Sequence, residues 1–127
     1  MKSNYTYRAY CDRVVDGDTL DLVIDLGFHM TTKQRVRLLG VDTPELRSKN
    51  PDERYRAREA TLRVEELIQE AVDYTFEEQG EFGWYLEITT FKADSFGRWL
   101  AIIDLSGGVG DLGGILIEEG HAVPYEK

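Results

Sequence analysis

The chain has 127 residues, 42% of them hydrophobic, so it can bury one core but is too short for two ordinary domains. Its lone cysteine excludes an internal disulfide, and no apolar stretch approaches the roughly 20 residues that a membrane-spanning helix needs. We therefore expect one domain over residues 1–127 with no membrane partner. Residues 1–10 also lack the apolar run of a secretory signal, so a cytoplasmic location is expected.

Charge is unevenly distributed along the chain, whose formal net charge is −9. Residues 33–63 hold nine of the 15 Lys and Arg residues but only five of the 24 acids, which gives this stretch +4 and the remainder −13. A negative net charge opposes the binding of a polyanion, but a molecule with one basic face can still guide nucleic acid. Alternatively, the arginines beyond Arg47 simply solvate a helix.

The first third of the chain has the pattern of three antiparallel strands. Residues 5–15 are rich in aromatic and β-branched side chains. Residues 19–26 alternate strictly, with one face formed by Leu20, Leu22, Ile24 and Leu26. After an interruption at Gly27, residues 33–39 resume a strand pattern in which Arg37 lies opposite the apolar Val36.

A long helix is predicted next, and more strands and a short helix follow it. Composition is strongly helical over residues 52–70, with an apolar stripe at helical spacing formed by Ala60, Val64, Leu67, Ile68 and Ala71. Further strands are predicted over residues 74–76, 84–91 and 99–105. A helix is predicted over residues 111–119, ended by Gly120. This order indicates an α+β fold, mostly β; five short strands suit a closed barrel of the oligonucleotide-binding (OB) type, although their spacing also allows an open sheet.

Two acidic turns lie at strand ends: Asp16-Gly17-Asp18-Thr19 before the second strand and Asp42-Thr43-Pro44-Glu45 after the third. If these strands pair as a hairpin, Asp18 comes to lie beside Asp42 and the pair can hold a cation. Carboxylate and carbonyl oxygens are hard ligands, which favour Ca²⁺ or Mg²⁺ over Zn²⁺. Taken singly, either turn is better explained as an Asx turn whose side chain hydrogen-bonds to its own backbone.

Basic residues near these turns complete a set suited to cleaving phosphodiesters. Arg37 precedes Asp42 by five residues, and Arg98 follows Gly97 in another predicted turn. Guanidinium groups and a metal stabilise the negative charge that gathers on the non-bridging oxygens of a phosphorane-like transition state. The attacking water must be positioned or deprotonated, a task for which Glu45 is well placed.

These motifs together resemble the staphylococcal nuclease (thermonuclease) family. The resemblance rests on residues 15–19 (VDGDT), 36–45 (VRLLGVDTPE) and 94–98 (DSFGR), with further similarity at the helix start, 55–60, and at 116–122 (LIEEGHA). It covers roughly residues 14–125, and a set of motifs in this order and spacing is highly specific.

The resemblance implies a five-stranded OB barrel with a helix inserted after the third strand and a short C-terminal helix. It implies Ca²⁺-dependent endo- and exonuclease hydrolysis of DNA and RNA, with products ending in 3′-phosphates in the prototype. By the resemblance, Asp18, Asp42 and the Thr43 carbonyl bind Ca²⁺ and Asp16 supports them, Glu45 orients or deprotonates water, and Arg37 and Arg98 hold the phosphate. Candidate substrate-binding residues are Phe96, Tyr125, Arg47 and Lys49. We expect a monomer whose partner is single-stranded DNA or RNA.

The chain departs from the prototype at three points. Ser95-Phe96 stands where the prototype has Lys-Tyr, so a cation and a phenol hydroxyl that contact nucleotide are missing. Up to Lys127 no segment resembles the prototype's last helix, and Tyr125 is the one counterpart found for the aromatic pair that lines its base pocket; Tyr125 either stacks on a base or packs the tail. The sequence pI of about 4.7 also differs from that of the basic secreted enzymes.

Two other functions fit the same sequence. One is a non-catalytic module that uses the barrel to bind nucleic acid or protein, because folds are reused and such domains can lose their chemistry. The other is a structural domain that interacts through its acidic surface. Loss of catalysis usually erodes the acidic and arginine positions, and all of them are present here, which favours the enzyme.

Overall fold

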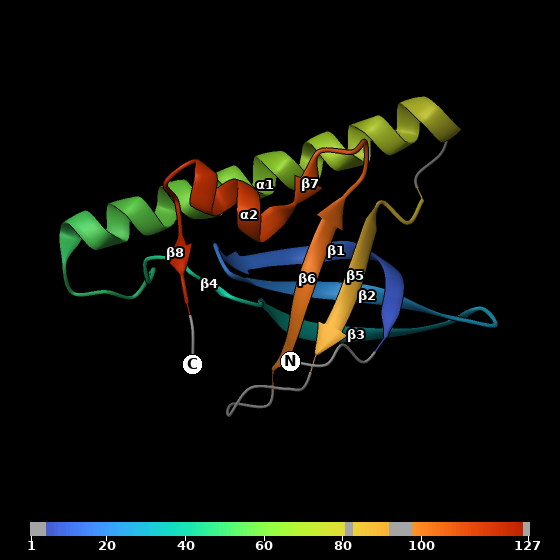
Figure 1. The fold of residues 1–127 in the computed structure, drawn as a ribbon, viewed down its shortest axis with the longest axis horizontal. Coiled ribbons are helices and arrows are strands. Elements are labelled where there is room, and N and C mark those ends of the chain that lie inside the picture. Colours follow the sequence, from blue (N-terminus) through green and yellow to red (C-terminus); the bar gives the residue numbers. More distant parts are fainter. Residues whose placement is uncertain (1–4, 81–82, 92–97, 126–127) are drawn as a thin grey trace.

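The structure, a computed structural model, describes residues 5–80, 83–91 and 98–125, and Figure 1 shows a β-barrel with one long helix lying across it. No described helix is both long and apolar enough to cross a membrane. In chain order the elements are β1 (Thr6–Asp16), β2 (Thr19–Gly27), β3 (Met30–Leu38), β4 (Val41–Asp42), α1 (Pro51–Gln79), β5 (Leu86–Phe91), β6 (Trp99–Leu105), β7 (Gly110–Asp111), α2 (Leu112–Glu118) and β8 (Val123–Pro124).

Five strands form the barrel in the order β3-β2-β1-β5-β6, and neighbours in this order are antiparallel. The barrel closes because β3 also pairs with β6, in parallel, with Val36 opposite Trp99 and Leu38 opposite Ala101. The fold is thus the α+β, mostly β, OB barrel expected from the sequence, with α1 following the third barrel strand and a short C-terminal helix, α2.

Alternation along β2 and β3 directs apolar side chains into the barrel. Their inward-facing residues are buried: Leu20, Leu22, Ile24, Val36 and Leu38. Each leucine buried to this extent contributes about 2 kcal/mol to folding. Leu26, predicted on the same inner face, is instead 41% exposed. It lies near the tip of the β2–β3 hairpin, which projects beyond the rest of the sheet (Figure 1).

Helix α1 begins at a strong capping signal and runs well past its predicted end at residue 70. The side chain of Asn50 accepts hydrogen bonds from the backbone N–H groups of Asp52 and Glu53, and Pro51 occupies the first turn. Gly80 ends the helix with a left-handed φ of 73°. The predicted apolar stripe is buried throughout: Ala60, Val64, Leu67, Ile68 and Ala71.

The strand predicted over residues 74–76 is wrong, because these residues belong to α1. Thr75 lies one turn after Ala71 and continues the buried stripe at 3% exposure, whereas Tyr74 and Phe76 are each 45% exposed. Aromatic side chains favour strands. Extending an existing helix, however, adds a hydrogen bond per residue without a new nucleation cost, and this outweighs the local preference.

Helix α2 is one residue shorter at each end than predicted and starts at an Asp111 cap. The Asp111 carboxylate accepts hydrogen bonds from the backbone N–H groups of Gly113 and Gly114, at 3.1 and 3.2 Å. A Cβ atom on Gly113 would lie 3.1 Å from the Val41 side chain, and one on Gly114 would lie 2.8 Å from the Asp111 carboxylate. The two glycines, which weaken the helix signal in the sequence, therefore allow both the cap and the contact with β4.

Cys11 lies on β1, partly buried against the core, and we expect it to be chemically inert. Burial raises the pKa of its thiol to about 12. The thiolate is the reactive form. Alkylation by iodoacetamide near pH 8 should therefore be at least about a hundredfold slower in the folded protein than in denaturant, because a cysteine in an unfolded chain has a pKa of about 8.5. Equal rates measured by mass spectrometry would contradict this packing.

Candidate active site

The two acidic turns meet at one rim of the barrel. In the β2–β3 hairpin Thr19 lies opposite Arg37, so the turn before β2 lies beside the residues that follow β3. The backbone N–H of Thr43 donates a hydrogen bond to Oδ2 of Asp18 at 3.3 Å, although 25 residues separate the two in sequence. The structure thus brings the two turns together, as the hairpin argument predicts.

Arg37 lies between the two aspartates at this rim. Its Nη2 donates to Oδ2 of Asp18 at 3.4 Å and to Oδ1 of Asp42 at 3.2 Å. The side chains of Arg37 and Asp18 are only 13% and 11% exposed, whereas that of Asp42 is 49% exposed. Water screens buried charges poorly, so the contact with Asp18 holds the guanidinium in place. Its Nε and Nη1 donors have no hydrogen-bond partner in the described part of the chain, so they remain available to a ligand.

Asp18 is oriented by several neighbouring groups. Thr19 Oγ1 donates to its Oδ1 at 3.0 Å, and Thr43 donates its backbone N–H to the other carboxylate oxygen. The backbone carbonyl of Asp18 accepts a bond from the Leu38 N–H at 2.8 Å. Thr19 was not singled out from the sequence as a site residue. Its position directly after the second aspartate, at the start of a half-buried strand, was the signal available.

Asp16 supports the turn from one side. Its Oδ1 accepts a hydrogen bond from the backbone N–H of Asp18 at 3.1 Å. Burial, together with the hydrogen bond and charge repulsion from the Asp18 side chain, raises the pKa of Asp16 to about 6. Two acids in one partly buried turn thus oppose each other's ionisation.

Gly17 lets the two turns approach closely, and its substitution should be costly. A Cβ atom there would lie 3.0 Å from both Cγ2 and Oγ1 of Thr43. Gly17→Ala should lower the free energy of unfolding by about 1–3 kcal/mol, as overpacking typically does. In a Thr43→Gly background the three crowding side-chain atoms, which include Thr43 Cβ at 3.1 Å, are all removed, so urea denaturation should show a much smaller loss for the same substitution. An equal loss in both backgrounds would contradict this contact.

The segment after α2 returns to the same rim. β8 pairs with β4, with Val123 opposite Asp42, and the Tyr125 N–H donates to the Gly40 carbonyl at 2.9 Å. This pairing places the Tyr125 ring 5.1 Å from the Arg37 guanidinium, in a cation–π contact. Tyr125 is 44% exposed, so it packs on Arg37 while one part of the ring stays open to solvent.

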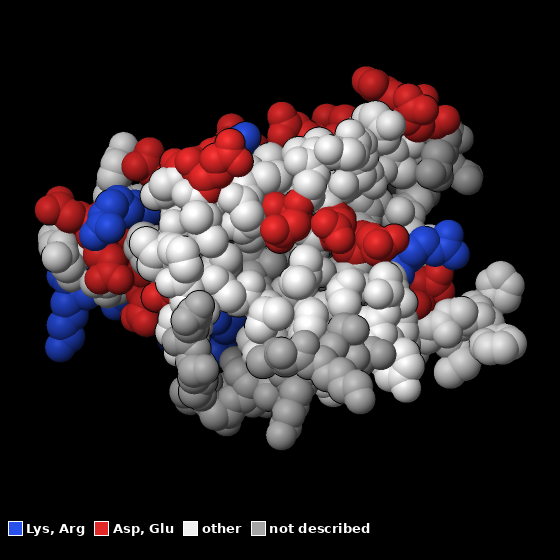
Figure 2. Space-filling view, in the orientation of Figure 1, with Lys and Arg blue, Asp and Glu red and all other residues white. Residues whose placement is uncertain are grey.

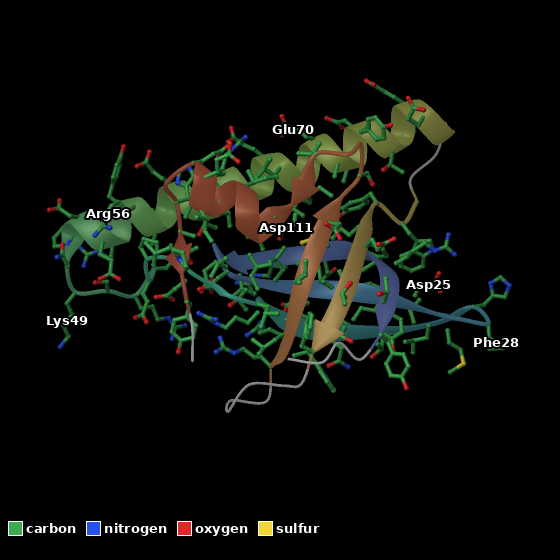
Figure 3. All side chains as sticks on the ribbon, viewed as in Figure 1. Asp25, Phe28, Lys49, Arg56, Glu70 and Asp111 are labelled. Atoms are coloured by element: carbon green, nitrogen blue, oxygen red, sulfur yellow. The ribbon has the colours of Figure 1, made fainter. Side chains whose placement is uncertain are left out.

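The other predicted site residues belong to the segment before α1, to the start of β6 or to the part of the chain outside the described residues. Glu45, Arg47 and Lys49 are exposed in the segment between β4 and α1; Figure 3 labels Lys49 near the start of α1. Arg98 is half-buried directly before β6. Since Trp99 pairs with Val36, the backbone of Arg98, one residue earlier, lies next to β3. Phe96, with the neighbouring Ser95, lies outside the described residues.

The donor set at the rim fits a hard divalent cation. Asp18 and Asp42 both contact the Arg37 guanidinium, and Asp16 accepts the backbone N–H of Asp18, so three carboxylates and one guanidinium at this rim leave an excess of negative charge carried by oxygen atoms. Within residues 5–80, 83–91 and 98–125, no three His, Cys, Asp or Glu side chains converge as a metal site. A cation at this rim would therefore need further oxygens from the backbone, from water or from a substrate.

Comparison with known proteins identifies the family of the chain. The model of one protein family, described as staphylococcal nuclease homologue, matches residues 35–127. A search of curated proteins found no match. The matched range begins after Asp16 and Asp18 in the sequence. It includes Arg37, and the β2–β3 hairpin brings Asp18 into contact with this residue. Because the match covers most of its length, the chain belongs to the staphylococcal nuclease homologue family.

Proposed function

We propose that the chain is a nuclease that uses Ca²⁺ to hydrolyse phosphodiester bonds in DNA and RNA. One observation supports this most strongly: a fixed guanidinium, that of Arg37, lies between the carboxylates of Asp18 and Asp42 at the barrel rim. Family membership adds to it, since the family is described as homologues of a nuclease.

Asp18, Asp42 and the backbone carbonyl of Thr43 are the proposed Ca²⁺ ligands. Asp16 acts behind them by accepting the backbone N–H of Asp18, which fixes the turn that carries this ligand. Thr19 fixes the orientation of the Asp18 carboxylate in the same way. When bound, Ca²⁺ supplies a positive charge that polarises the phosphate and offsets the charge developing on its oxygens.

Arg37 and Arg98 are proposed to bind the phosphate and stabilise its transition state. Arg37 is suited to this because one nitrogen is anchored on the aspartates while Nε and Nη1 remain open to a ligand. A guanidinium fixed in advance needs no reorganisation as charge develops, and loss of one such donor typically slows catalysis on the order of a hundredfold to a thousandfold. Tyr125 restricts Arg37 further through its ring.

Glu45 is proposed to orient or deprotonate the attacking water. Its backbone is held in place, since its N–H donates to Glu53 Oε2 at 3.2 Å and its carbonyl accepts from Ser48. Its carboxylate is exposed and has no partner among the described residues, so it is free to bind water beside a substrate. Such a role needs hydrogen-bond reach to water in the complex, which an unliganded geometry need not show.

The substrate is proposed to be single-stranded nucleic acid bound by a monomer. Figure 2 shows Lys and Arg side chains gathered near the start of α1, which is the end of the helix that the segment after β4 joins. Exposed Arg47 and Lys49 can contact backbone phosphates there, and Tyr125 and Phe96 are the candidates for stacking on a base. Attraction from so few cations should weaken strongly with added salt.

Digestion of heat-denatured DNA tests the proposal. We expect fragments to appear with Ca²⁺ and to stop appearing when a chelator is added. The same assay with single-stranded RNA tests the second substrate. If the protein binds both polymers but cleaves neither, over a range of pH and divalent metals, the chain is a non-catalytic binding module and the proposed function is wrong.

A further inference from the structure

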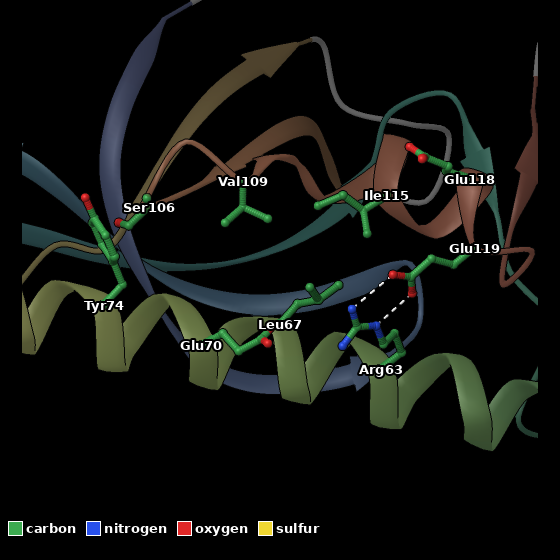
Figure 4. A pocket seen from close by; sticks show the side chains of 10 residues that line it. Arg63, Leu67, Glu70, Tyr74, Ser106, Val109, Ile115, Glu118 and Glu119 are labelled. Atoms are coloured by element: carbon green, nitrogen blue, oxygen red, sulfur yellow. Dashed lines mark hydrogen bonds and ion pairs between the residues drawn. The ribbon is translucent and has the colours of Figure 1, made fainter.

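A second surface feature lies between the C-terminal half of α1, helix α2 and the turn over residues 106–109. It is a groove of about 520 Å³ that shares no residue with the proposed active site. Figure 4 shows Leu67 pointing from α1 toward Val109 and Ile115, which line the opposite wall. Val109 is 54% exposed and Tyr74, at one end of the groove, is 45% exposed. The groove therefore offers apolar surface to a ligand.

The surroundings of this groove are strongly acidic. Residues 51–63 of α1 include four arginines, whereas residues 64–79 include six acids and no Lys or Arg. α2 and the residue after it add Glu118 and Glu119. Figure 2 shows these acidic side chains gathered along the edge of the molecule that α1 and α2 form. This surface repels nucleic acid and attracts cations.

Most of the negative charge at the groove is not neutralised by the protein itself. Arg63 is the one basic residue among the described residues that line it, and this side chain is already bound by Glu119, at 2.7 and 3.0 Å, and by Glu66 at 3.5 Å. Glu70 and Glu118 also line the groove, and neither has an ion-pair partner in the described part of the chain. Two carboxylates without an ion-pair partner among the described residues thus lie beside the apolar wall of the groove.

We propose that this groove binds a short basic segment of another protein, in which apolar side chains alternate with Arg or Lys. The apolar side chains would pack on Tyr74, Val109 and Ile115, and the basic ones would pair with Glu70 and Glu118. A small inorganic cation would leave the apolar wall uncovered, and a nucleic acid would meet like charge. Charge complementarity and apolar burial therefore select the same kind of partner.

Fluorescence anisotropy with a labelled peptide tests this surface without any assay of nuclease activity. The probe contains the run Arg-Leu-Arg-Leu-Arg, and a control peptide carries Ser in place of each Leu. We expect Glu70→Gln combined with Glu118→Gln to weaken binding of the probe about tenfold. The matched control is Glu65→Gln combined with Glu87→Gln, which changes the net charge equally at two exposed positions outside the groove. It should change the affinity less than about twofold.

The apolar wall has its own test in the same experiment. Val109→Ser should weaken binding of the Leu-containing probe severalfold and leave the Ser-containing peptide unaffected, because only the former packs on this wall. The proposal is overturned if the probe does not bind, if both pairs of Glu variants lose affinity equally, or if Leu and Ser peptides bind alike. It is also overturned if sedimentation shows a dimer that Glu70→Gln with Glu118→Gln dissociates, since a second copy then occupies the groove.

Discussion

Replacing Arg37 with alanine is expected to slow the Ca²⁺-dependent hydrolysis of single-stranded DNA by about a hundredfold to a thousandfold. Arg37 is fixed at the rim by Asp18 and Asp42, and its remaining donors are open to a phosphate. The loss should appear mainly in kcat, because charge on the phosphate oxygens grows as the transition state is reached. Initial rates on a labelled oligonucleotide measure it.

Arg35 provides a matched control for this substitution. It lies two residues away on β3, carries the same charge and is bound by Asp21 at 2.8 Å instead of by Asp18 or Asp42. Arg35→Ala should change kcat less than about threefold. Arg37→Lys keeps the charge next to Asp18 but loses the fork of donors, so it should fold well and still be slow. If Arg37→Lys and Arg35→Ala are both as active as the unaltered protein, Arg37 has no part in the mechanism.

Calcium is expected to raise the melting temperature of the protein by on the order of 10 °C at a concentration a hundredfold above its Kd. A ligand that binds only the folded state contributes about 2.7 kcal/mol at that excess. For a domain of this size, this free energy corresponds to a shift of that order. Thermal unfolding followed by circular dichroism, with and without Ca²⁺, measures the shift independently of catalysis.

Two aspartate variants show whether the ion binds where we propose. Asp18→Asn and Asp42→Asn should each remove most of the Ca²⁺-dependent shift, whatever they do to the melting temperature without calcium. Asp21→Asn is the matched control, because Asp21 pairs with Arg35 instead of facing the rim. A shift that survives in both rim variants would place the calcium site elsewhere on the molecule.

Features with a local signal were predictable from the sequence. The β2–β3 hairpin is one of them, because Leu20 and Leu22 alternate with polar residues and Gly27 marks the turn. Hairpin geometry then fixes which ends meet, so the proximity of Asp18 to Asp42 follows without knowledge of the rest of the fold. The start of α1 is another, since Asn50-Pro51 is a helix-start signal followed by a periodic apolar stripe.

Features that depend on distant partners were not predictable in this way. The parallel pairing of β3 with β6, which closes the barrel, joins Val36 to Trp99 across a long stretch of chain. The two-residue pairing of β4 with β8 places Tyr125 on Arg37, and nothing in either segment indicates it. The end of α1 was not predictable either. The aromatic residues Tyr74 and Phe76 favour strands locally, but packing of the helix overrides that preference.

The outer part of the site is less determined by the fold than its centre. The side chains of Arg37 and Asp18 are held by protein partners, so the folded chain alone fixes their positions. The exposed side chains of Glu45, Arg47 and Lys49 have no such partners among the described residues. Motif resemblance identifies Glu45, while Arg47 and Lys49 are candidates only through their charge and position, and the positions of all three during a reaction depend on the substrate.

A crystal structure of the protein with Ca²⁺ and a short single-stranded oligonucleotide carrying phosphorothioate linkages tests the central claim most directly. We predict that the ion lies between Asp18 and Asp42 in contact with the Thr43 carbonyl, and that one linkage lies against the open donors of Arg37. An oligonucleotide bound on another face, or an ion held away from both aspartates, would contradict the assignment of this rim as the active site.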